Sequence, residues 1–271
     1  MAIAQSEQSA AAAPGSERFE VRRIGNAEIR ESLAQGWDDF LARRGDLIFV
    51  GLIYPLVGLA SALLFTGGNL LYLLFPVVAG ISLLGPVAAV GFYELARRRE
   101  DGLESDWSHF LDVRKRPARD SLMLVAGLLF VIFILWVAVA AILWNSLIGI
   151  APTSVANLLS LAFGTPGGWA LIVIGNLAGL AFAALVLTLS VVSMPMLVDC
   201  DVDAPTALDT SVRAVMRNKG PMARWGLIVA ALLVLGSIPA FVGLAVVLPV
   251  LGYATWHLYA HAVVREGTRC A

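Results

Sequence analysis

The chain has 271 residues, of which 59% are hydrophobic and 14% are charged, and its mean hydropathy is +0.81. Soluble domains average about 45–50% apolar and about 25% charged residues, so this composition excludes an ordinary water-soluble globule. The net charge of −1 and the pI near 6.3 also exclude the basic stripe that nucleic-acid binding requires.

The N-terminal residues 1–20 are rich in Ala, Ser and Gln, and we expect a disordered tail there. This stretch lacks the basic start and apolar core of a cleavable signal peptide. A transmembrane domain is expected over residues 21–265, followed by a short C-terminal tail over 266–271.

Three long stretches contain no charged residue: 47–93, 121–198 and 225–264. A helix crosses the ~30 Å hydrocarbon layer with about 20 residues, and its backbone must be hydrogen-bonded internally. Each stretch therefore predicts two crossings. The six predicted spans are 47–65, 70–93, 121–144, 171–196, 222–238 and 240–264.

Two connections within these stretches are less regular. Between the third and fourth spans, Val155, Leu158, Leu159, Ala162 and Phe163 recur at helical spacing, which predicts a short helix on the outer surface. Residues 225–264 suit two crossings that turn near 236–239, although one long bent helix also fits. The predicted fold class is all-α, a polytopic membrane protein of three helical hairpins.

The distribution of charge predicts the orientation. With six spans, all 19 Lys and Arg residues fall on one side, and the opposite connections carry none. The positive-inside rule then places both termini in the cytoplasm of a bacterial inner membrane. Cys200 and Cys270 fall on the same side, where thiols usually stay reduced, so both are expected to be free.

An internal repeat is suggested by two polar segments that precede hairpins. One reads Trp37-x-x-Phe40-Leu41 and the other Trp107-x-x-Phe110-Leu111. We predict an amphipathic cytoplasmic surface helix before each hairpin, although apolar low-complexity sequence also aligns readily with itself. On the first of these helices, Ile29, Leu33, Trp37, Phe40 and Leu41 form one apolar stripe that would lie under the bilayer.

Two further stretches carry a family resemblance. They are Met194-Pro195-Met196-Leu197 through Asp199, Ala204, Ala207, Ser211, Val215 and Asn218, and the closing segment from Leu248 to Tyr259. The chain resembles, over roughly residues 22–264, a family of bacterial integral membrane proteins catalogued as a domain of unknown function. The resemblance implies the fold and implies no activity and no site residues.

The sharpest chemical signal is the pair His257 and His261, which share a helix face four residues apart. Such a pair can hold a metal or haem, but no third ligand is evident nearby, and interfacial polar residues are the commoner explanation. Glu94, beside three arginines, is expected to be solvated and paired. No cofactor or metal is expected.

A permeation path is the second candidate. Pro86, Pro195 and Pro249 each free a helix carbonyl and could line such a path, as broken helices do in transporters. Asn176, within the fourth span, is more simply explained by a bond to its own backbone or to a neighbouring helix.

The leading functional prediction is a non-enzymatic inner-membrane protein that binds a protein partner or a second copy of itself. The alternatives are a small permease or channel lined by the proline-kinked helices, and a haem or metal protein using the histidines of the sixth helix. Solute flux into liposomes tests the permease, and an absorption spectrum with metal analysis tests the third prediction.

Overall fold

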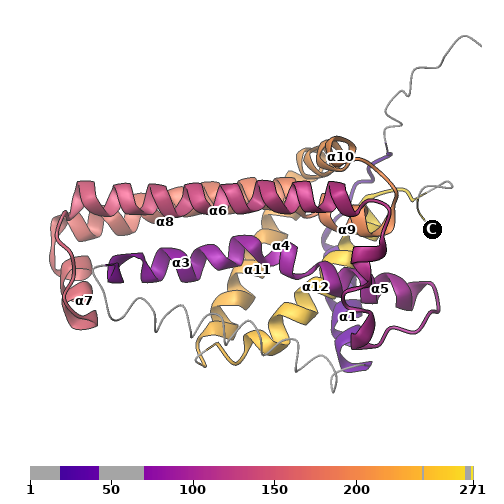
Figure 1. Ribbon diagram of the computed structural model, residues 1–271, viewed down its shortest axis with the longest axis horizontal. Coiled ribbons are helices and arrows are strands. Elements are labelled where there is room, and N and C mark those ends of the chain that lie inside the picture. The colour runs from indigo at the N-terminus through magenta and orange to yellow at the C-terminus, as the bar shows by residue number, and fades with distance from the viewer. Residues whose placement is uncertain (1–18, 43–69, 240, 266–269, 271) are drawn as a thin grey trace, which may run out of the picture.

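The computed structural model describes residues 19–42, 70–239, 241–265 and 270 (Figure 1). The described residues form helices joined by turns, with two isolated β-bridges and no strand, which confirms the all-α class. The predicted first span, 47–65, and most of the N-terminal tail lie outside the described residues. Phe19 and Glu20, which we expected in the disordered tail, are part of an ordered extended segment.

The longest helices are α6 (Arg119–Leu147) and α8 (Pro166–Ser190), which lie side by side along the molecule (Figure 1). On α6 the buried side chains recur every three or four residues, from Leu122 to Trp144, while the intervening large apolar side chains are exposed. This pattern is that of a helix with one face on its neighbours and the other available to lipid. The predicted short helix is present as α7 (Val155–Gly164).

The predicted second span is a broken run of helix. It consists of η1 (Leu71–Leu73), α3 (Leu74–Ile81), η2 (Ser82–Leu84), α4 (Gly85–Ala88) and α5 (Val90–Glu100). The indole N–H of Trp136 on α6 donates to the carbonyl of Pro76 at 2.7 Å, and the same ring packs on Gly80. A β-carbon at Gly80 would approach Trp136 to 2.7 Å, so glycine permits this close contact between α3 and α6.

After α8 the chain continues through α9 (Ser193–Asp199) and α10 (Ala204–Arg217). The side chain of Asp203 accepts from the Thr206 amide and Pro205 occupies the first turn, so both residues stabilise the start of α10. The buried face of α10 is formed largely by small residues, including Ala204, Ala207 and Ala214, which allow α10 to pack closely on α8 and α9.

Residues 219–262 form two helices, not one bent helix. They are α11 (Lys219–Ser237) and α12 (Leu244–Ala262), which pack against each other (Figure 1). A β-carbon on Gly243 would lie 2.8 Å from the Gly236 carbonyl oxygen, so the tight turn requires glycine at this crossing. The predicted turn near 236–239 is therefore confirmed.

The N-terminal helix α1 (Asn26–Ala42) packs along α12. Its buried face is Ile29, Ser32, Gly36, Asp39 and Phe40, while Trp37 and Leu41 of the predicted apolar stripe are exposed on the protein. Gly36 lies directly against the backbone of Ala254, so this small and polar face of α1 is turned towards α12.

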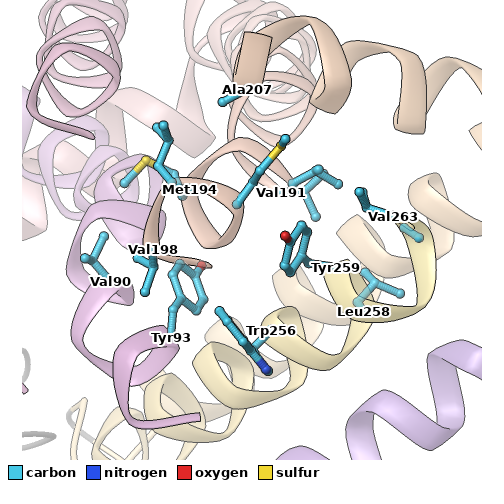
Figure 2. Close-up of a cluster of buried hydrophobic side chains, with 14 of the residues drawn as sticks. Val90, Tyr93, Val191, Met194, Val198, Ala207, Trp256, Leu258, Tyr259 and Val263 are labelled. Carbon is cyan, nitrogen blue, oxygen red and sulfur yellow. The ribbon is translucent and has the colours of Figure 1, made fainter. Parts of the chain in front are cut away.

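The main core lies where α5, α9, α10 and α12 converge, at the end of the molecule opposite α7 (Figures 1 and 2). Figure 2 shows Tyr93, Met194, Trp256 and Tyr259 among the side chains that fill it. All four are at most 3% exposed. We call this end of the molecule, comprising α1, α5, α9, α10, the second half of α12 and the α5–α6 connection, the polar end, because the buried charged residues gather there.

Among the described residues, four helical runs are long and apolar enough to cross a membrane: Leu71–Glu100, Arg119–Leu147, Pro166–Asp199 and Lys219–Ser237. They coincide with four of the six predicted spans. The predicted sixth span is α12, which is not among the four and is largely buried in its second half. Its crossing, the repeat and the membrane position of the surface helices stay predictions.

The predicted surface helix before the second hairpin is wrong. Residues 107–115 instead form two short 3₁₀ turns, η3 (Trp107–His109) and η4 (Asp112–Lys115), linked through Phe110. Phe110 packs edge-on against Phe92 at 5.0 Å, and this contact with α5 fixes the turn. An isolated apolar repeat in the sequence does not distinguish such a turn from a helix.

Candidate functional site

Both histidines singled out from the sequence point towards α1. His257 Nε2 lies 2.7 Å from a carboxylate oxygen of Asp39, and Arg99 Nε lies 3.0 Å from the other oxygen. Asp39 is 8% exposed, so its charge is shared between an arginine and an imidazole away from bulk water. These three side chains thus join α1, α5 and α12.

His261, one turn further along α12, is also engaged. Its Nδ1 lies 3.2 Å from the Ser32 hydroxyl and its Nε2 lies 3.8 Å from the Glu31 carboxylate. The two imidazoles share one helix face, as predicted, but each has a partner on α1. In the part of the chain that the structure describes, the metal-capable group identified is Asp199, Cys200 and Cys270, which includes neither histidine.

A second polar network surrounds Arg265, just beyond α12. Its guanidinium pairs with Glu100 and lies 3.7 Å from Asp199, and it covers the rings of Trp256 and Tyr259 at about 6 Å. The Trp256 indole donates to Glu100 at 2.9 Å, and the Tyr259 hydroxyl donates to Asp199 at 2.8 Å. This network joins the C-terminal segment to α5 and α9.

The expectation of free thiols is wrong, because Cys200 and Cys270 form a disulfide across 70 residues of sequence. The chain after α12 returns to the start of the α9–α10 link, where residues 200 and 270 form an isolated antiparallel bridge. Neither the number of cysteines nor the expected reducing compartment indicated that Cys270 lies beside Cys200. The bond therefore ties residue 270 to the core.

Glu94 is buried, contrary to the expectation of a solvated pair. It is 1% exposed and accepts from Arg97 at 2.9 Å and from Arg116 at 3.0 Å, with Arg98 at 4.0 Å. The first two distances are those of charge-assisted hydrogen bonds. Arg116 comes from the α5–α6 connection, so the buried carboxylate anchors that connection on α5.

A neighbouring cluster on the same connection is more exposed. The Asp112 carboxylate accepts hydrogen bonds from Lys115 Nζ and from His109 Nδ1, each at 2.7 Å. These hydrogen bonds from Lys115 and His109 lower the pKa of Asp112 to about 2. Its carboxylate is consequently ionised throughout the neutral range, which keeps the η4 turn closed.

The candidate permeation residues lie in separate elements. Pro86 is in α4, Pro195 in α9 and Pro249 in α12. Asn176 is exposed on α8 and donates to the carbonyl of Ile172 at 2.6 Å, so its amide bonds to its own helix. This bond is the simpler of the two explanations offered for Asn176.

Sequence reasoning missed the role of Ser211. Its hydroxyl donates to the Thr188 carbonyl at 2.8 Å and accepts from the Val192 amide at 3.2 Å. Those two backbone groups would bond each other in a continuous helix, so the Ser211 side chain is inserted into the ladder where α8 ends and α9 begins. Pro195, which has no N–H, follows closely and marks this break.

Asn218 has a comparable role at the C-terminal end of α10. It is 3% exposed, accepts from the Ile24 amide at 2.9 Å and donates to the Arg22 carbonyl at 3.0 Å. The extended segment before α1 is thereby fixed on α10. Ser211 and Asn218 are both among the residues that carry the family resemblance, and this was the one sequence signal for their importance.

Residues 74–199 match the family model described as "Predicted integral membrane protein (DUF2189)". This segment is similar to that family. The match covers the three helical runs from α3 to α9, while the resemblance of the closing segment, Leu248 to Tyr259, lies beyond it. No curated protein and no solved structure is found to be similar to the chain. The protein is an integral membrane protein with several apolar helices, and the family description adds no activity.

Proposed function

We propose that this is a non-enzymatic, multi-pass protein of the bacterial inner membrane that binds a protein partner at its polar end. In this proposal six spans place both termini in the cytoplasm. The support is the charge distribution, because all 19 Lys and Arg residues then fall on the cytoplasmic side. The buried charged groups described above bond chiefly to one another, which suits a structural role for them.

The observation that carries the proposal is how the repeated Trp-x-x-Phe-Leu motif is used. In the first copy Phe40 is 4% exposed, while Trp37 is 45% and Leu41 39% exposed. In the second copy Phe110 packs on Phe92, while Trp107 and Leu111 are more than half exposed. Each motif thus presents a Trp and a Leu outward.

These exposed side chains lie on α1 and on the α5–α6 connection, which are both at the end opposite α7 (Figure 1). Large apolar side chains exposed in otherwise polar segments are typical of interaction sites, and Trp is enriched among the residues that dominate binding. They belong to the polar connections rather than to the apolar runs that would face lipid.

Both motifs lie in acidic segments. Residues 26–42 contain four Asp or Glu and one Arg, and residues 101–112 contain four Asp or Glu and no Lys or Arg. A basic cluster follows each segment, at 43–44 and at 114–116. A protein partner with apolar and basic groups complements the acidic segments that carry the motifs.

Photocrosslinking in living cells tests the proposal. A benzoylphenylalanine at Trp37 or Trp107 is expected to form adducts with a protein, whereas the same group at Leu180, which is exposed on the apolar helix α8, should form lipid adducts. Replacing the Trp and Leu of one motif by Ala should remove the protein adduct formed at the other. Lipid adducts alone at positions 37 and 107 would reject the proposal.

A further inference from the structure

The disulfide between Cys200 and Cys270 has two sulfurs in unequal environments. Cys200 is 3% exposed and belongs to the core, whereas Cys270 is half-buried. A dissolved reductant therefore reaches the sulfur of Cys270 more readily. The bond links residue 270 to the start of the α9–α10 link.

The groups around Cys200 determine what reduction leaves behind. Its sulfur lies 3.5 Å from the Tyr259 hydroxyl and 3.9 Å from the Asp199 carboxylate. A negatively charged thiolate there would be repelled by the carboxylate, so the neutral thiol is the favoured product. It would remain in the core, held by the packing of α9.

A disulfide on the cytoplasmic side calls for a particular explanation. Structural disulfides are rare in the cytosol, and those that occur there in mesophiles are usually transient, catalytic or redox-sensing. The charge distribution that places both termini in the cytoplasm also places Cys200 and Cys270 there.

We propose that Cys200 and Cys270 form a redox-sensitive latch, which holds Cys270 on the α9–α10 link when oxidised and releases it when a dithiol reductant opens the bond. This inference rests on the cytoplasmic orientation proposed above and not on the partner. The disulfide would be a regulatory element of its own, and partner binding through the exposed Trp and Leu residues does not depend on it.

The opening reaction is an ordinary thiol–disulfide exchange. One thiolate of the dithiol attacks Cys270 Sγ, the S–S bond breaks, and Cys200 Sγ leaves with the electron pair and takes up a proton. The second thiol of the reductant then attacks the mixed disulfide, which releases Cys270 as a thiol after protonation. The protein disulfide gains two electrons, and the dithiol is oxidised to its own disulfide.

The redox state in cells provides the first test. Cells are treated with diamide as an oxidant or with dithiothreitol, quenched with acid, denatured, and alkylated with a maleimide–polyethylene glycol that retards the protein on a gel. The latch predicts no adduct after diamide and two adducts after dithiothreitol. Two adducts under both treatments would show that no bond forms, and no adduct under either would show a permanent structural bond; each result overturns the proposal.

The second test measures release of Cys270 from the α9–α10 link. In the purified protein reduced under native conditions, the latch predicts one adduct from Cys270 and a second, from Cys200, on addition of denaturant. Cys200→Ser should react at Cys270 without reductant, while Cys270→Ser should react only after denaturation. Protection of Cys270 from the maleimide in the reduced native protein would mean that Cys270 stays in place, which contradicts a latch.

Discussion

The close contact between α1 and α12 at Gly36 gives a prediction whose size follows from the structure. In Gly36→Ala the new β-carbon would lie 2.6 Å from the backbone nitrogen of Ala254 and 2.8 Å from its Cα. Real β-carbons do not approach backbone atoms this closely. The backbone of α12 cannot move aside as the end of a flexible side chain could. The two helices must therefore move apart.

Two effects of opposite sign set the magnitude. Overpacking of a tight contact costs about 1–3 kcal/mol, while replacing Gly by Ala inside a helix stabilises it by about 0.5–1 kcal/mol. The expected net loss is centred on about 1 kcal/mol of unfolding free energy, within a range of about 0–2.5 kcal/mol. Separation of the helices would also loosen the Asp39–His257 bond, whose two residues lie on the same interface.

The assay is thermal unfolding in detergent, with Gly127→Ala as the matched control. Gly127 is also inside a long helix, α6, and a β-carbon there meets nothing within 4 Å. The control should keep or raise the Tm, whereas Gly36→Ala should lower it by several degrees, since 1 kcal/mol corresponds to about 2–4 °C in chains of this size. Equal Tm values for the two variants would refute the proposed packing of α1 on α12.

Three further predictions concern single polar side chains. Ser211→Ala leaves the carbonyl of Thr188 without its bond and should cost about 1–3 kcal/mol, seen as a lower Tm; an unchanged Tm would contradict the inserted hydroxyl. Asp39→Asn should lower the Tm, and its effect should not add to that of Arg99→Ala, because the two residues share one ion pair; additive effects would speak against the pair. Asp112 has its pKa lowered from 3.8 to about 2, so it stabilises the fold above pH 4 and this contribution is lost as the pH falls towards 2. The difference in Tm between the wild type and Asp112→Asn should accordingly disappear over that range, and a constant difference would exclude this role.

The helices were predictable from the sequence because apolar stretches without charge have few alternatives in a membrane protein. Residues 121–144 are helical as expected, and so are 171–190 and 193–196, while the turn between α11 and α12 lies where Gly236 and Pro239 indicated. The break between α8 and α9 was missed, because the Ser211 side chain that forms it comes from another helix.

The polar contacts were not predictable in the same way. Asp39 meets His257 across 218 residues of sequence, and the partner of Cys200 is 70 residues away. Such pairs depend on how the helices pack at the polar end, and hydropathy carries no information about that. The burial of Glu94 was missed for the same reason, since its neighbour Arg116 comes from a separate turn of the chain.

The account depends most on the position of the polar end relative to the membrane. Single cysteines at Lys219, beside α10, and at Ser160, on α7, can be introduced into a chain whose own two cysteines are serine, and intact cells can then be treated with a membrane-impermeant maleimide. The account predicts labelling at position 160 in intact cells, and at position 219 only after the membrane is permeabilised. Labelling of position 219 in intact cells would contradict the orientation and, with it, the placement of every charged residue on one side.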